Sequence, residues 1–329
     1  MFLNEQLMII FVLSQAGIGL LGNLTLLMVY ASIFFFQSNQ KKTTDLILTH
    51  LIMTNTVILI TQIFPGVVVT FGMMNFLGDV GCLIIMYIRR VARGLSICTT
   101  CLLSVFQAIT ISPSTSRWGQ LKHRTPNYIL PSLLFFWLLN MLIYINLVTK
   151  TMALKNVTIT GSGYHVQSCS NVFRESYLND ITFIITMTFR DLFFLFLMSC
   201  TSGYMVMMLH QHRKRVQHIH TTNLSPKPSA ESKATQSILL LVSCFVCFYC
   251  INSSITVYLN FMKKEDFQVY DIVAFLGGGY ASLSPLVLIS SDHRVRRAPC
   301  SLEEVRSLSL PRMGGYQSKS TSLGQVGPK

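Results

Sequence analysis

Residues 82–111 read CLIIMYIRRVARGLSICTTCLLSVFQAITI, an apolar run that is long enough to cross a membrane yet contains three arginines. A helix of about 20 residues, rising 1.5 Å per residue, spans the roughly 30 Å hydrocarbon core of a bilayer. On the insertion scale the arginines cost about 9 kcal/mol, and the apolar side chains offset about 6 of that. We therefore expect a membrane helix whose arginines face a bundle interior or a wet cavity.

Six other segments are apolar over a comparable length. They are residues 7–36, 46–71, 128–148, 181–209, 238–261 and 269–290. Membrane β-strands are only about ten residues long and alternate in hydropathy, so helices are favoured over a barrel. The pattern predicts an all-α membrane protein, a seven-transmembrane helix bundle formed by one domain, residues 1–291. The polar remainder, residues 292–329, is expected to be a disordered cytoplasmic tail.

The overall composition supports a lipid environment. The chain is 51% hydrophobic and only 12% charged, whereas soluble proteins have about 25% charged residues. A formal net charge of +13 could suggest nucleic acid, but such binding needs basic residues gathered on one folded face. Here the basic residues lie between apolar runs, so we expect a lipid bilayer and no nucleic acid as partner.

The distribution of Lys and Arg predicts the orientation, because cytoplasmic loops carry the excess. With the N-terminus outside and the C-terminus inside, 17 of the 26 basic residues face the cytoplasm and five face the exterior. Those expected inside, as candidates to face a signalling partner, include Arg117, Lys122, Arg213, Lys214 and Arg215. The same charges would also serve simply to fix the topology and contact anionic lipid.

Charged residues within the spans are the candidate ligand-binding residues. Arg89 and Arg93 are four apart and share a helix face, whereas Arg90 points about 100° away. Arg190 and Asp191 lie in the fifth span, and adjacent helical residues do not face each other. We expect each to pair elsewhere, Asp191 with a third-span arginine.

These charges have two interpretations: structural ion pairs, or a pocket open to the outside. A buried guanidinium binds carboxylate or sulfate bidentately, so a pocket of this kind would suit an anionic or acceptor-rich ligand.

Cysteines and one sequon add expectations about the outer side. Cys82 and Cys169 would both face the oxidising compartment, where a disulfide between them would persist. Asn156 begins an Asn-Val-Thr sequon in the same outer loop, which is either glycosylated or unused. Cysteines at metal-like spacing, such as Cys98 and Cys101, lie in apolar spans and are interpreted as small apolar residues.

The sequence shows no combination of nucleophile, base and orienting group, so we expect neither an enzyme nor a metal or other cofactor. Two classes of membrane protein stay open at this point. A channel or transporter could use the intramembrane arginines as an anion path. A bitter taste receptor would share the topology.

Several blocks of this sequence resemble vomeronasal type 1 receptors. They are residues 76–82 (FLGDVGC), 87–113 (YIRRVARGLSICTTCLLSVFQAITISP), 116–118 (SRW), 215–219 (RVQHI), 224–226 (LSP), 234–243 (ATQSILLLVS) and 283–288 (LSPLVL). The third-span block is specific to that family, and the resemblance covers nearly the whole chain before residue 293.

The resemblance implies a rhodopsin-like G protein-coupled receptor in the plasma membrane of chemosensory neurons. Such a receptor binds a pheromone or related small chemosignal and activates an inhibitory-type heterotrimeric G protein. The resemblance also supports the Cys82–Cys169 bridge and a glycan at Asn156. One departure from the wider rhodopsin-like pattern is that Gln107-Ala108-Ile109 replaces the acidic-Arg-aromatic triplet.

Overall fold

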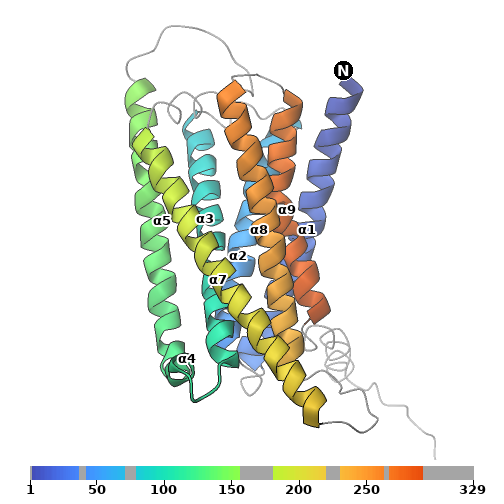
Figure 1. Cartoon of the computed structure of the whole chain (residues 1–329). Coiled ribbons are helices and arrows are strands. Elements are labelled where there is room, and N and C mark those ends of the chain that lie inside the picture. The colour runs from blue at the N-terminus through green and yellow to red at the C-terminus, as the bar shows by residue number, and fades with distance from the viewer. Residues whose placement is uncertain are drawn as a thin grey trace, which may run out of the picture.

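The computed structural model describes residues 2–36, 42–70, 79–155, 181–219, 230–262 and 267–291. Within these ranges all regular structure is helical, and seven long helices form an elongated bundle (Figure 1). The helices are α1 (Phe2–Phe36), α2 (Thr43–Thr70), α3 (Asp79–Ile111), α4 (Arg117–Leu121), α5 (Thr125–Lys155), α7 (Ile181–Ile219), α8 (Ala230–Met262) and α9 (Phe267–Ser291). The expected all-α bundle is confirmed, and α4 is a short helix between α3 and α5.

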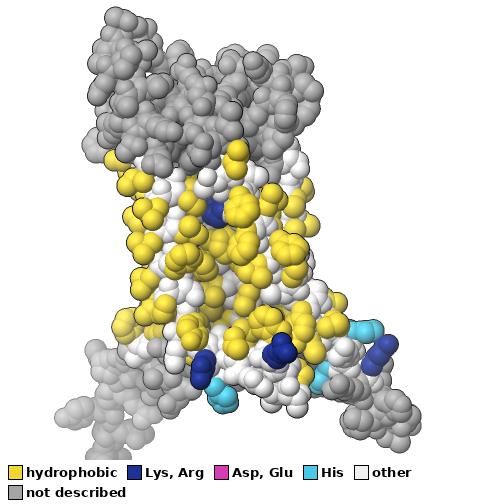
Figure 2. Space-filling view, turned by 60° about the vertical axis from the view of Figure 1, so that its left-hand side comes forward, with side chains coloured by type: hydrophobic (Ala, Val, Ile, Leu, Met, Phe, Trp, Pro, Cys, Tyr) yellow, Lys and Arg dark blue, Asp and Glu magenta, His cyan; other side chains and the backbone are white. Residues whose placement is uncertain are grey.

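Six helices contain described segments that are long and apolar enough to cross a membrane. The described apolar part of the seventh, Phe275–Ser290, lies in the 25-residue helix α9, which is about 37 Å long. On the face drawn in Figure 2, hydrophobic side chains form a broad band, with Lys, Arg and His side chains along its lower edge. The chain is therefore a multi-pass membrane protein.

Helix α3 lies at the centre of the bundle. It packs against α2, α5, α7 and α8, and its segment Leu83–Ile111 is 78% buried, against 22% for Thr125–Ile145 of α5. Side chains such as Leu95, Cys98 and Leu103 are completely or almost completely buried. This central position explains how α3 accommodates arginines, because they extend among other helices rather than into lipid.

Close contacts of small and polar residues join α1 to α9. A Cβ atom at Gly19 would lie 2.6 Å from the backbone Cα of Ser282. The completely buried Asn23 donates from Nδ2 to the carbonyl of Ala281 at 2.9 Å. Small residues that allow close approach, together with interhelical hydrogen bonds, are the usual means by which membrane helices associate.

A second polar contact joins three helices. Asn55 of α2 donates to Ser284 Oγ of α9 at 2.8 Å and accepts from Ser96 Oγ of α3 at 3.0 Å. The amide is completely buried, so its hydrogen bonds fix the rotation of all three helices.

Helix α1 begins at the end of the bundle where α5 ends and α7 starts (Figure 1). We call this the N-terminal end; α4 lies at the other, the α4 end. Several expectations fall outside the described part of the chain: Cys169, Asn156, the side chains of Cys82, Arg213 and Arg215, and the tail 292–329.

Candidate ligand pocket and its polar network

Arg190 and Asp191 form an ion pair with each other. Nε and Nη2 of Arg190 donate to Oδ1 of Asp191 at 2.8 and 2.6 Å. Each also has a partner on another helix, as expected, but the expectation that Asp191 would pair with a third-span arginine was wrong. The long arginine side chain folds back onto the neighbouring carboxylate, which sequence spacing on a rigid helix does not capture.

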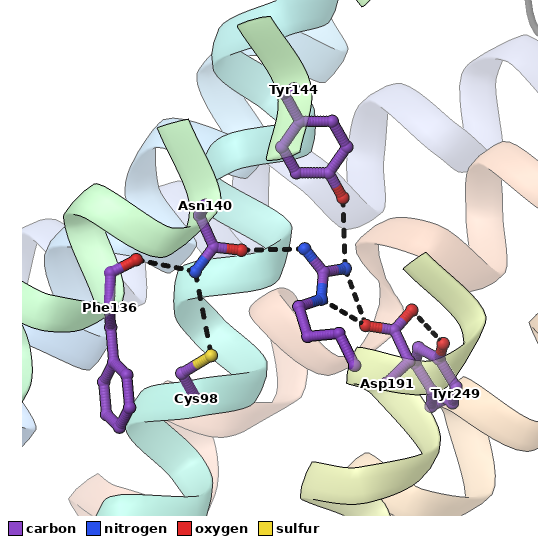
Figure 3. A network of polar contacts seen from close by, with 7 residues as sticks. Cys98, Phe136, Asn140, Tyr144, Asp191 and Tyr249 are labelled. Atoms are coloured by element: carbon purple, nitrogen blue, oxygen red, sulfur yellow. Dashed lines mark hydrogen bonds and ion pairs between the residues drawn. The ribbon is translucent and has the colours of Figure 1, made fainter. Parts of the chain in front are cut away.

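Other helices complete this pair (Figure 3). Arg190 Nη1 donates to Asn140 Oδ1 at 2.8 Å, and Nη2 donates to the hydroxyl of Tyr144 at 3.1 Å. From α8, the Tyr249 hydroxyl donates to the second carboxylate oxygen of Asp191. The network thus joins α5, α7 and α8 around one charge pair.

The charge pair is deeply buried, since Arg190 is 6% and Asp191 7% exposed. Breaking such a pair by removing one partner costs about 3–5 kcal/mol, because the remaining charge stays buried. The further bonds to Asn140, Tyr144 and Tyr249 satisfy the donors and acceptors that the pair leaves over. The network therefore holds the three helices in one arrangement.

Gly94 of α3 provides the space that this network occupies. A Cβ atom at Gly94 would overlap Asn140 Oδ1 and lie 2.8 Å from Arg190 Nη1. Asn140 cannot easily withdraw, because its Nδ2 also donates to the carbonyl of Phe136 at 2.8 Å. Only a residue without a side chain fits here.

A pocket lies beside the network, between α2, α3, α8 and α9. Its walls are formed by Ile58, Arg93, Ser96, Phe245, Phe248, Tyr249, Leu276, Gly277, Tyr280 and Ala281. The space open to the centres of water-sized molecules is about 30 Å³, enough for one or two waters. Any larger occupant must therefore displace the aromatic walls.

Tyr249 links the pocket to the network. The guanidinium carbon of Arg93 lies 5.8 Å from the centroid of its ring, within the range of a cation–π contact. The ring also stacks on Phe245 at 6.1 Å between centroids. Because the Tyr249 hydroxyl also bonds Asp191, a movement of Arg93 that shifts the Tyr249 ring would disturb that hydrogen bond.

Arg89 and Arg93 of α3 point to the same neighbouring helix, as their spacing of four residues predicts. A Cβ atom at Gly277 of α9 would lie 3.7 Å from Arg93 Nη1 and 3.9 Å from Arg89 Nη2. The two guanidiniums therefore approach the same bare stretch of α9 backbone. Arg90, like the other two, is half-buried. Arg93 lies about 21 Å along α3 from its first residue, well inside the bundle.

Three network residues escaped the sequence analysis. Asn140 and Tyr144 are polar and four residues apart in an apolar segment, a signal that marks one functional helix face. Tyr249 gave no such signal, because its helix is rich in aromatic and small polar residues at every angle.

The candidate G protein-facing residues lie at the α4 end. Arg117, Lys122 and Lys214 are exposed there. In the interior at the same end, Gln107 Nε2 of α3 donates to Thr235 Oγ1 of α8 at 3.1 Å. The basic rim therefore surrounds a neutral, buried contact between two helices.

In the described part of the chain, six long helices are bundled with a charged central seventh, α3, and enclose a largely aromatic pocket. This arrangement defines a seven-transmembrane protein of the G protein-coupled receptor class. The chain belongs to the vomeronasal organ pheromone receptor family, whose family model matches residues 6–301.

Individual relatives agree. The chain is 38% identical to human vomeronasal type-1 receptor 4, over 87% of this chain and 94% of that protein. It is 36% identical to human vomeronasal type-1 receptor 3, over 87% and 91%. It is 32% identical to olfactory receptor class A-like protein 1 of Danio rerio, over 89% and 92%. The family consists of chemosensory receptors of the G protein-coupled type and not of enzymes.

Proposed function

We infer that this receptor binds a small chemosignal with an anionic group, which enters from outside the cell and is seated between α3, α8 and α9. Binding then activates a cytoplasmic heterotrimeric G protein of the inhibitory type. The observation that carries the proposal is the convergence of Arg89 and Arg93 on Gly277, beside a pocket.

The chemistry of this convergence favours an anion. Guanidinium groups bind carboxylate, sulfate or phosphate oxygens through paired charge-assisted hydrogen bonds. Arg89 makes no hydrogen bond or ion pair with any other side chain that the structure describes. The one carboxylate of the network, Asp191, is engaged by Arg190 and Tyr249. A ligand anion would therefore complement Arg89, with the guanidinium of Arg93 close beside it.

The rest of the pocket suggests the ligand's body. Phe245, Phe248 and Tyr280 present aromatic faces and edges, and Phe245 meets Tyr280 edge to face at 4.6 Å between centroids. Aromatic walls favour a ligand with an apolar or aromatic body. A compact organic acid combines both features.

Signal transfer is proposed to run through α8. Tyr249 of α8 lines the pocket. Thr235, nearer the α4 end of the same helix, accepts a hydrogen bond from Gln107 of α3. A ligand that favours a shifted α8 moves the equilibrium by its differential affinity for that state. A shift of α8 away from α3 would open a groove at the α4 end, into which a helix of the G protein could bind.

An anion channel was the competing hypothesis for the intramembrane arginines. The pocket has room for only one or two water molecules, which disfavours a conducting path through it. Anion flux measured in reconstituted vesicles would separate the two, since a receptor gives none.

A tethered anion tests the proposal. Gly277→Asp would place a carboxylate within reach of both guanidiniums, where it competes with the ligand; Gly277→Asn adds nearly the same volume without the charge. Cells that display each variant are exposed to carboxylates, sulfates and their neutral analogues, and G protein activation is recorded. We expect the Asp variant to raise the effective concentration of anionic agonists at least tenfold relative to the Asn variant. Equal responses from the two variants, or activation by neutral analogues alone, would contradict the proposal.

A further inference from the structure

The segment between α3 and α5 forms an exposed basic surface at the α4 end. Arg117, Lys122, His123 and Arg124 are all exposed. Residues 112–128 contain no Asp or Glu. The surface is therefore uniformly positive and suits a partner that carries negative charge.

Large apolar and aromatic side chains are interleaved with these charges. Trp118 is 55%, Leu121 47% and Tyr128 59% exposed. Trp118 and Leu121 are three apart and so lie on one side of the α4 turn. Trp and Tyr prefer the interface between lipid and water, because one end of each ring is apolar and the other polar. We call these three residues with Arg117, Lys122 and Arg124 the α4 surface.

The α4 surface continues directly into the lipid-facing side of α5. Beyond Tyr128, Leu130 and Leu134 are each 57% exposed on that helix. In Figure 1, α4 lies beneath α5 at the edge of the bundle opposite α1 and α9. In Figure 2, basic side chains border the hydrophobic band directly. The charges therefore lie at the level where phospholipid head groups meet the hydrocarbon.

Hydrogen bonds hold the backbone beneath the α4 surface in place. Ser116 caps α4 by accepting from the Gly119 amide at 3.0 Å, and its own amide donates to the Pro113 carbonyl at 2.9 Å. Gly119 is buried, and a Cβ atom there would collide with that carbonyl. Ser112 is in turn bonded to Tyr204 of α7 at 2.9 Å. A backbone that is already fixed lowers the ordering cost of binding, because only the side chains still have to be immobilised.

We propose that the α4 surface is a binding site for anionic phospholipid, in which Arg117, Lys122 and Arg124 contact the phosphate-bearing head group while Trp118 and Tyr128 enter the interface. Its position at the lipid edge distinguishes it from a protein-docking groove, which would lie between helix ends such as those of α3 and α8. The site is independent of the ligand pocket. It shares with the proposed function only the placing of the α4 end in the cytoplasm, where anionic lipids concentrate.

Lipid binding to the purified receptor tests this site. Native mass spectrometry counts bound phosphatidylserine and phosphatidylcholine at matched concentrations, without any chemosignal present. Each basic residue should contribute about fivefold to the affinity for anionic lipid. We expect the triple variant Arg117→Gln, Lys122→Gln and Arg124→Gln to lose at least tenfold in preference for phosphatidylserine. Trp118→Ala should weaken binding of both lipids at this site.

Two controls keep the outcome decisive. Lys42→Gln with Lys214→Gln removes two other exposed charges and should leave the preference unchanged, and the charge-keeping triple of Arg117→Lys, Lys122→Arg and Arg124→Lys should retain it. The soluble head group glycerophosphoserine should not compete. The proposal is overturned if the Gln triple keeps the wild-type preference, if the control pair loses as much, or if glycerophosphoserine competes equally. It is also overturned if the triple variant binds lipid normally but loses G protein activation, because the surface is then a protein contact.

Discussion

Gly94→Ala should disrupt the polar network with a single methyl group. The added Cβ would overlap Asn140 Oδ1 and lie 2.8 Å from Arg190 Nη1. Asn140 must then release Arg190, and a hydrogen bond to a charged group is worth about 1.5–3 kcal/mol. Against this, replacing Gly by Ala inside a helix stabilises by about 0.5–1 kcal/mol. The net expected loss is about 0.5–2.5 kcal/mol.

Gly203→Ala provides the matched control, because nothing lies within 4 Å of a Cβ atom at that position of α7. It should only gain helix stability. The assay is the apparent melting temperature of purified receptor, followed by a thiol-reactive dye or by loss of monodisperse protein. We expect Gly94→Ala to melt about 1–4 °C below the wild type, and Gly203→Ala to melt at or above it.

A melting temperature for Gly94→Ala equal to that of Gly203→Ala would refute the reasoning. It would mean that Asn140 moves aside at no cost, so that its bond to Arg190 does not hold α5 to α7. A second outcome would be equally damaging: Gly94→Ser, with a still larger side chain, matching the wild type.

Three further substitutions test other parts of the same mechanism. Arg93→Ala should raise the ligand concentration that gives half-maximal G protein activation at least tenfold, while the amount of receptor at the cell surface stays normal. An equal loss of ligand response and of surface display would indicate a structural role. Tyr249→Phe keeps the ring beneath Arg93 but removes the donor to Asp191, so the melting temperature should fall by an amount corresponding to about 1.5–3 kcal/mol; an unchanged value would count against the bond. Gln107→Leu removes the bond to Thr235, and because a neutral bond is worth about 1 kcal/mol, basal G protein activation without ligand should rise about fivefold. Unaltered basal nucleotide exchange in that variant would show that this contact does not restrain α8.

The expected helices follow closely from the apolar segments, and the remaining differences lie at their ends. Helix α7 runs to Ile219, ten residues past the predicted end of its apolar stretch, and its last turns are basic. Polar residues such as Lys214 need no lipid and continue the helix into water, so hydropathy underestimates its length. By contrast, α3 ends at Ile111, just before Pro113, where a proline residue disfavours further helix.

The candidate site was predictable only in part. That Arg89 and Arg93 would share a face follows from the helix repeat alone, and the structure places both beside Gly277. The pairing of Asp191 was predicted wrongly, because the flexible Arg190 side chain is not bound by the geometry of the backbone. Tyr249 could not be found from sequence, since its importance depends on which residues α7 and α3 turn toward it.

Length and composition alone indicate an all-helical membrane protein with charges in its interior. In hydrocarbon every backbone amide must be satisfied within its own segment, and an arginine facing lipid is too costly, so few other folds are possible. Which partner each charge takes follows instead from how the helices pack. Those partners depend on helix rotation and on single missing side chains, such as Gly94 and Gly277, whose effect exists only once neighbouring helices pack against them.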